Sequence, residues 1–237
     1  MLIRYDQLLH SLETVEQRIG YRFADRELLY NAFIHSSYHH EHPEHAEHSN
    51  ERMEFFGDSI LGLIVSEHLY QSCPDQPEGA LSHLRSLLVG ANACQTYVEK
   101  LDIAEFLLVG RGEMLGKSSL CAAANDLFEA LIAAIYLDGG YSSAQAFFFR
   151  HFTDEVAAII ASPPRHWKIE LHELAQRLFN EPPDYRILAE EGPSHQRHYT
   201  VGVWVGGECW GEGTGNNKKE AQQDAAKTAM QSYKERK

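Results

Sequence analysis

The sequence lacks several features that would place it in other classes of protein. It contains no run of about 18 apolar residues, and its N-terminal residues do not form the apolar stretch of a secretory signal. Its four cysteines, Cys73, Cys94, Cys121 and Cys209, are far apart and form no Cys-X-X-Cys pair, which argues against a disulfide framework or a zinc knuckle. These absences predict a soluble cytoplasmic protein with reduced thiols and no membrane-spanning segment.

Positive charge is also scarce. The 237 residues carry 21 Lys and Arg against 34 Asp and Glu, a formal net charge of −13. Taken alone, this charge argues against a polyanionic partner. However, residues 1–161 hold 10 Lys and Arg against 23 Asp and Glu, whereas residues 162–237 hold 11 of each kind. The acidic excess is therefore confined to the first part of the chain.

Hydrophobic periodicity divides the chain into two domains. Within residues 1–161, apolar residues recur at helical spacing in successive segments, one of which covers residues 102–108. This pattern predicts an all-helical domain. Residues 162–167 contain a Pro-Pro pair and are expected to form a linker. Residues 168–237 change to a helix, three short strands with alternating apolar residues, and an Ala-rich helix. The predicted fold class is multi-domain, all-α followed by α+β in the order α-β-β-β-α.

Residues 50–59 hold the most informative pattern. Read as a helix, they place Glu51, Glu54 and Asp58 within an arc of roughly 60°. A solvated acidic face near a helix N-terminus would explain one such pattern, because the helix dipole favours it. Neighbouring carboxylates nevertheless repel each other, and a bound cation is the usual compensation.

A second helix repeats this pattern. Asp126 and Glu129 stand three residues apart on one face, beside a stripe of apolar residues. A single helix with an acidic face is readily explained as a solvent-exposed surface. Two such helices in one small helical domain predict a shared metal-binding cleft. A further acid, Glu78, stands where a helix is expected to begin, a position that the helix dipole alone also favours.

Local features of the first acidic helix give further expectations. The helix is expected to begin at a cap formed by Ser49 or Asn50. Gly57 and Gly62 inside it each cost about 1 kcal/mol relative to alanine. We therefore predict that both glycines permit close packing of another element.

A histidine-rich segment precedes this helix. Five histidines occur between residues 39 and 48, a spacing that is compatible with a metal site. The segment also contains a proline and three glutamates and has no apolar period, so we predict a flexible, solvated loop. A metal-storage or metal-sensing protein that uses this loop is an alternative. The histidines are His39, His40, His42, His45 and His48.

The last predicted helix begins with Lys218 and Lys219. Cations at a helix N-terminus oppose the helix dipole, so helix stability alone would not select them. Together with the free backbone N–H groups of the first turn they form a candidate phosphate-binding site.

With these residues the chain resembles bacterial ribonuclease III over nearly its whole length. Residues 50–59 match that family's signature, and Glu78, Asp126 and Glu129 lie where the family has its other acids. Residues 168–229 resemble a double-stranded RNA-binding domain. In it, His172 and Asn217 stand where the family commonly has Gln and Ser.

The resemblance implies a homodimeric endonuclease that cuts both strands of double-stranded RNA and leaves 5′-phosphate and 3′-hydroxyl ends. Its substrates would be rRNA, mRNA and other precursors. Oxygen-only ligands favour Mg²⁺, with Mn²⁺ as a substitute. A non-catalytic regulator that binds double-stranded RNA is the alternative function.

The resemblance also assigns roles by motif position. The metal ligands would be Glu54, Asp58, Asp126 and Glu129, with Asp58 and Glu129 catalytic, Glu51 and Glu78 supporting, Phe55 at the dimer interface, and His172, Gln176, His195, Lys218 and Lys219 binding RNA.

Overall fold

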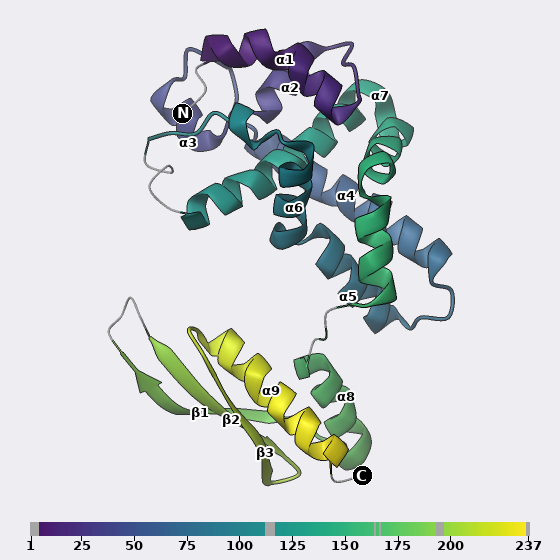
Figure 1. The fold of residues 1–237 in the computed structure, drawn as a ribbon, viewed down its shortest axis with the longest axis vertical. Helices are drawn as coiled ribbons and strands as arrows, with labels where there is room; N and C mark the ends of the chain where they lie inside the picture. The colour runs from purple at the N-terminus through teal and green to yellow at the C-terminus, as the bar shows by residue number, and fades with distance from the viewer. Residues whose placement is uncertain (1–4, 112–116, 164, 166, 193–196, 236–237) are drawn as a thin grey trace. The chain divides into compact units, whose positions relative to one another are not determined.

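The computed structural model describes residues 5–111, 117–163, 165, 167–192 and 197–235. The chain folds into two compact units, Met1–Pro163 and Pro164–Lys237 (Figure 1). Within the described residues, the first unit is helical and the second combines helices with one sheet. This architecture confirms the predicted fold class. The limits predicted for the domains and for the linker at 162–167 stay predictions.

The first unit is built from helices of very different lengths. Its two longest helices, α4 and α7, pack against each other, and Gly140, with φ of 75°, kinks α7. The helices are α1 (Tyr5–Ile19), α2 (Arg26–Ala32), α3 (Ser36–Glu41), α4 (Glu51–Ser72), α5 (Glu78–Val89), α6 (Ala91–Leu101), the 3₁₀ helix η1 (Ala104–Phe106) and α7 (Lys117–Ala161).

Aromatic side chains fill the core between α6 and α7. Tyr97 of α6 contacts the rings of Phe128, Phe148 and Phe152 of α7, at centroid distances of 5.0, 5.6 and 4.3 Å. All four side chains are fully buried. Because large buried aromatic groups contribute strongly to core stability, this cluster anchors α7 to α6 on both sides of the Gly140 kink.

Three local predictions for the first unit fail wholly or in part. A Cβ atom at Gly62 would meet no atom within 4 Å, so none of the described residues of the chain packs closely against this glycine. Asn50 occupies the predicted N-cap position of α4, but its side chain forms no capping hydrogen bond, and its Nδ2 donates instead to the Ala32 carbonyl oxygen at 3.2 Å. The segment 102–108 forms only the short η1, because Asp102 ends α6 in the left-handed region, at φ of 53°.

The histidine-rich segment is more ordered than predicted. Its first three residues belong to α3, and the remainder leads to α4 through a turn in which the His45 N–H donates to the His42 carbonyl oxygen at 3.1 Å. Ala46 is buried within this segment. Short polar contacts and one apolar anchor therefore hold a stretch whose composition suggested a solvated loop.

The second unit places two helices on one face of a three-stranded antiparallel sheet (Figure 1). The strands pair in the order β1-β2-β3, and inward residues of β2 such as Val201 and Val203 are fully buried against the helices. The elements are α8 (Trp167–Phe179), β1 (Asp184–Glu191), β2 (His198–Val205), β3 (Glu208–Gly215) and α9 (Lys218–Glu235).

Small residues allow α9 to lie directly on β3. A Cβ atom at Gly213 would lie 2.0 Å from the backbone nitrogen of Ala225, and Gly211 and Gly215 approach α9 in the same way. The alanines on the inner side of α9 are buried in this contact. The Ala-rich pattern of α9 thus has a partner in the glycines of β3.

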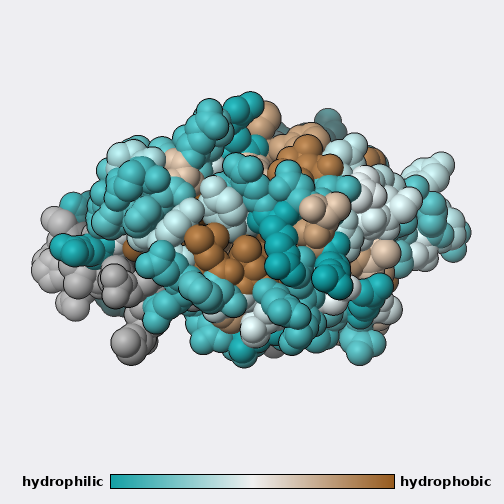
Figure 2. All heavy atoms as spheres, turned by 90° about the horizontal axis from the view of Figure 1, so that it is seen from above, coloured by the Kyte–Doolittle hydropathy of each residue, from teal (hydrophilic) through white to brown (hydrophobic). Residues whose placement is uncertain are grey.

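The face of the molecule seen in Figure 2 is mainly polar. On the face shown in Figure 2, hydrophilic residues surround a few apolar patches. Among the described residues, none of the helices combines the length and the apolar character that crossing a membrane requires.

Candidate active site and RNA-binding surface

The predicted metal ligands meet where α4 crosses α7. A Cβ atom at Gly57 would lie 1.8 Å from the carbonyl oxygen of Glu129, so the two backbones are almost in contact. Glu54 and Asp58 flank Gly57 on α4, and Asp126 lies nearly one turn before Glu129 on α7. The crossing therefore brings these four carboxylates, predicted from two distant segments, into one cluster.

The electrostatics of the cluster reflect this proximity. Glu129 is only 7% exposed, and burial, followed by the charges of Asp58 and Glu54, raises the pKa of its carboxyl group to about 7. The pKa of Glu54 is also raised, first by burial and then by the charges of Asp126 and Glu51. Carboxylates that disfavour each other's ionisation gain from a divalent cation, and their hard oxygen atoms fit Mg²⁺ or Mn²⁺.

A histidine that sequence reasoning left without a role lies beside the cluster. His35 is nearly buried, and its Nε2 lies 3.6 Å from Oδ2 of Asp126. Its Nδ1 accepts the Ser37 N–H at 3.2 Å, so in the neutral ring the proton resides on Nε2, which faces Asp126. The Ser37 hydroxyl oxygen in turn accepts the N–H of Gly110 at 2.9 Å. The contacts of His35 with Asp126 and of Ser37 with Gly110 join segments far apart in sequence, so residue spacing alone could not predict them.

The two acids predicted to play supporting parts lie in different surroundings. Glu51 is exposed at the start of α4, accepts a hydrogen bond from the Ser49 hydroxyl at 3.1 Å, and contributes to the raised pKa of Glu54. Glu78 is exposed in the first turn of α5 and accepts a hydrogen bond from the Ser82 hydroxyl at 3.1 Å. Glu51 thus adjoins the carboxylate cluster, whereas Glu78 belongs to the surface between α4 and α5.

Phe55 lies on an exposed apolar face of α4. Its side chain is 79% exposed, and Leu63 and Tyr70, eight and fifteen residues further along, lie on the same side of the helix and are also exposed. A hollow of about 330 Å³ opens beside Leu63 and Tyr70. It is also lined by Ser66, Glu67, Leu69, Glu78, Leu81, Ser82 and Arg85.

The paired lysines stand at a well-capped helix N-terminus. The Asn217 side chain accepts the Glu220 N–H at 2.9 Å and donates to the Glu220 carboxylate at 2.7 Å. This arrangement is a variant of the capping box with Asn in the cap position, in which the Glu220 carboxylate also accepts the backbone N–H of Asn216, at 3.0 Å, rather than that of Asn217. Lys218 and Lys219 are exposed in the first turn, and Glu220 offsets their unfavourable interaction with the helix dipole. The capping box was visible in the sequence, where Glu follows Asn by three residues.

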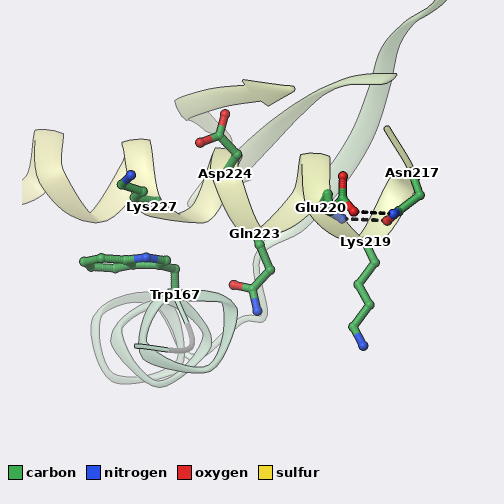
Figure 3. Close-up of a pocket in the computed structure, with 7 residues that line it drawn as sticks. All are labelled: Trp167, Asn217, Lys219, Glu220, Gln223, Asp224 and Lys227. Carbon is green, nitrogen blue, oxygen red and sulfur yellow. Dashed lines mark hydrogen bonds between the residues drawn. The ribbon is translucent and has the colours of Figure 1, made fainter. Parts of the chain in front are cut away.

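Next to this turn, α8 and α9 enclose a shallow pocket. Figure 3 shows the Trp167 ring facing α9, with Lys219 and Gln223 on the side of the helix toward Trp167 and Asp224 on the other side. The Lys168 ammonium group donates to the Gln222 side chain at 2.7 Å. These contacts fix the start of α8 against the start of α9.

Two of the other predicted RNA-binding residues lie on α8. His172 and Gln176 are exposed one turn apart on the same side of α8, and Gln176 donates to the Asn180 side chain at 3.0 Å. His195 lies outside the described residues. The structure therefore places His172 and Gln176 together on one helix and the lysine pair on the next.

Clustered carboxylates that hold divalent cations are the catalytic centres of many nucleases, and a three-stranded sheet with two helices on one face is a common module for duplex RNA. Their combination in one chain defines the class, a nuclease that acts on double-stranded RNA. Residues 25–156 match the family model described as ribonuclease-III-like, and residues 167–233 match the double-stranded RNA binding motif. The chain belongs to the ribonuclease III family.

Relatives support this assignment over most of the sequence. The chain is 42% identical over 229 residues to ribonuclease 3 of Protochlamydia amoebophila, covering 95% of this chain and 93% of that protein. It is 40% identical over 215 residues to ribonuclease 3 of Symbiobacterium thermophilum, covering 90% of this chain and 91% of that protein.

Solved structures agree for the first unit. The first unit matches a solved structure of the nuclease domain of ribonuclease III from Campylobacter jejuni with a TM-score of 0.55 and 31% identity. That structure was described for structural flexibility in a region involved in dimer formation. The match covers 60% of this chain and 96% of that one. The chain is therefore a metal-dependent endoribonuclease that acts on double-stranded RNA, and the non-catalytic alternative has no support.

Proposed function

We propose that Glu54, Asp58, Asp126 and Glu129 form the hydrolytic centre and hold Mg²⁺, with Mn²⁺ as a substitute. The approach of Gly57 to the Glu129 carbonyl supports this proposal most directly, since it brings the two acidic helices into contact, and the charges of Asp58, Glu54 and Asp126 all help to raise the pKa of Glu129 after burial. Magnesium would supply Lewis-acid chemistry, which strengthens water as a nucleophile and stabilises the leaving oxygen. The products are 5′-phosphate and 3′-hydroxyl ends.

Each carboxylate has a distinct position in this centre. Asp58 is exposed and accessible to an RNA backbone, whereas Glu129 is buried and anchored by the helix crossing. His35 lies beside Asp126 with Nε2 toward its carboxylate, and Glu51 adds negative charge at the edge of the cluster. Glu78 acts from the neighbouring surface, where a long duplex can reach it. The enzyme cleaves rRNA and mRNA precursors in the cytoplasm.

Magnesium dependence of cleavage tests the metal assignment. A long RNA duplex is incubated with chelator-treated protein, and Mg²⁺, Mn²⁺ or Ca²⁺ is then added back. We expect cleavage to return with Mg²⁺ or Mn²⁺, and the new ends to carry 5′-phosphates. Full activity in the presence of excess chelator would contradict the proposal.

We propose that Lys218 and Lys219 contact RNA phosphates and that His172, Gln176 and His195 contact the grooves of the RNA duplex. Replacing both lysines with alanine is expected to weaken binding to duplexes of any sequence and to reduce the slope of log affinity against log salt by about 1 to 2. Lys234→Ala, ~24 Å away along α9, is the matched control and should leave that slope unchanged. Filter binding at several salt concentrations measures both effects, and an unaltered slope in the double variant would count against the assignment.

We also propose that two chains pair through the apolar face of α4, with Phe55 entering a hollow on the partner. An exposed row of large apolar residues beside a hollow is typical of a protein interface. Phe55→Ala is expected to raise the dimer dissociation constant by about 100-fold or more, because each dimer loses two buried aromatic side chains. Sedimentation velocity over a concentration series measures this change. Leu9→Ala, at an exposed position of α1, is the control, and equal dissociation constants in both variants would refute the role of Phe55.

A further inference from the structure

Three side chains in the segment between α3 and α4 converge on one point away from the carboxylate cluster. Nδ1 of His42 lies 3.4 Å from Oε1 of Glu44, and Nε2 of His45 lies 3.7 Å from the same oxygen. All three ligand atoms lie within 4.8 Å of one another. In a tetrahedral site with bonds of 2.0 to 2.2 Å, neighbouring ligand atoms are roughly 3.3 to 3.6 Å apart. The observed arrangement thus comes close to the ligand spacing of a metal ion.

Neighbouring groups hold this arrangement in place. The Tyr38 hydroxyl forms a hydrogen bond of 2.8 Å with Nδ1 of His45, which leaves Nε2 facing Glu44. The Tyr5 ring stacks on His45 at a centroid distance of 4.4 Å, and the rings of His42 and His45 stack at 5.2 Å. Metal-binding histidines commonly have such a partner on the second ring nitrogen, which fixes the orientation of the ring.

Glu44 interacts with both histidines, but neither contact is a short hydrogen bond. Separations of 3.4 and 3.7 Å exceed the usual length of an N–H···O hydrogen bond. A divalent cation would use the lone pairs of both imidazoles and the carboxylate at once.

The types of ligand indicate the class of metal. Imidazole with one carboxylate suits zinc and its neighbours cobalt, nickel and copper, whereas magnesium prefers oxygen ligands alone. His42 and His45 are half-buried and Glu44 is exposed, so an ion can enter from solvent and keep a water as a further ligand. We propose that His42, Glu44 and His45 form a site for a divalent transition metal, separate from the carboxylate cluster of α4 and α7.

The position of this site gives the bound metal a structural consequence. His42 follows the last residue of α3, and α3 begins directly after His35, whose ring faces Asp126. The segment that contains the site continues into the N-terminus of α4. Metal binding would therefore cross-link the connection between two elements that carry residues of the active site.

Zinc binding to the full chain tests the proposal. Chelator-treated protein is titrated with Zn²⁺ in a large excess of Mg²⁺, which occupies the carboxylate cluster, and binding is followed by calorimetry and by metal analysis after dialysis. We expect one zinc ion per chain. The double variant His42→Ala plus His45→Ala should bind it at least 100-fold more weakly, whereas His40→Ala plus His48→Ala, the matched control in the same segment, should bind it as the wild-type protein does.

Two further variants distinguish this site from zinc bound at the carboxylate cluster. Asp126→Asn plus Glu129→Gln should retain the zinc ion, since these residues belong to the carboxylate cluster. Tyr38→Phe should weaken zinc binding by about 10-fold through loss of the contact to His45. Wild-type protein that holds no zinc in excess Mg²⁺, or equal losses in the two histidine double variants, would overturn the proposal.

Discussion

Replacing Glu129 with glutamine is expected to lower the rate of duplex cleavage by at least about 1,000-fold and to leave duplex binding unchanged. The substitution keeps the shape of the side chain but removes a buried charge that the proposed metal requires, and a loss of about 4 kcal/mol in transition-state stabilisation corresponds to that factor. Binding should persist because the RNA-binding residues belong to the other unit. Single-turnover cleavage and filter binding measure the two quantities on the same duplex.

Glu13→Gln is the matched control, because it removes an exposed carboxylate of α1 by the same substitution. This variant should cleave RNA as the wild-type protein does. Cleavage by Glu129→Gln within 10-fold of the wild-type rate would show that Glu129 is not part of the hydrolytic centre.

The same substitution should stabilise the metal-free protein at alkaline pH. The pKa of Glu129 is raised to about 7, whereas an unfolded chain returns it to about 4.5, so the folded state binds the extra proton between these values. Stability contributed by this group is therefore present at low pH and is lost as pH rises through 7. At pH 8 the ionised carboxylate costs up to about 3 kcal/mol, which Glu129→Gln removes. Denaturant unfolding with chelator should show the variant more stable than wild type at pH 8 and similar to it at pH 5.

Local sequence patterns were sufficient for the architecture of both units. The change from helical spacing to alternating Tyr199, Val201 and Val203 predicted the sheet, and the structure buries these valines against α8 and α9. The acids of α4 and α7 were found because helical spacing places them on one face, which requires only neighbours in sequence. Their meeting in space was predicted from the presence of two such acidic helices in one small domain, because the spacing within each helix does not determine how the helices pack.

The features that sequence reasoning missed depend on contacts between distant segments. His35 faces Asp126 only because α3 and α7 approach each other, and no spacing rule connects residues 35 and 126. The histidine-rich segment was assigned to a solvated loop from composition, although Tyr5 and Tyr38 order it through ring stacking and a hydrogen bond. Composition does not report which aromatic residues a polar segment will meet.

The two glycines of α4 illustrate the same limit and lead to the second large effect. Both cost helix stability in the same way, and helical spacing alone predicts the same role for both. In the structure, a Cβ atom at Gly57 would collide with the Glu129 carbonyl, whereas one at Gly62 would meet open space. The same substitution at the two sites should therefore have opposite effects.

Gly57→Ala is expected to destabilise the protein by about 3 kcal/mol and to lower cleavage by 100-fold or more. The added methyl group cannot fit between two backbones, so α7 must move away from α4 and carry Glu129 out of register with Glu54 and Asp58. A displacement of about 1 Å in a catalytic group is enough for a 100-fold loss of rate. Thermal unfolding and single-turnover cleavage, measured well below the unfolding temperature of the variant, separate the two effects.

Gly62→Ala provides the matched control, because it makes the identical change five residues further along the same helix. Its methyl group meets no atom of its own chain within 4 Å, so it should leave the crossing of α4 and α7 intact and raise the stability of the single chain by up to about 1 kcal/mol through helix propensity. Because Gly62 lies two turns from Phe55 on the same side of α4, cleavage is compared at protein concentrations at which both variants are dimeric. If Gly57→Ala cleaves as fast as Gly62→Ala once both are folded, the close crossing of α4 and α7 does not set the geometry of the carboxylates. A loss of cleavage in Gly57→Ala but not in Gly62→Ala would show that the catalytic carboxylates keep their positions only because residue 57 has no side chain.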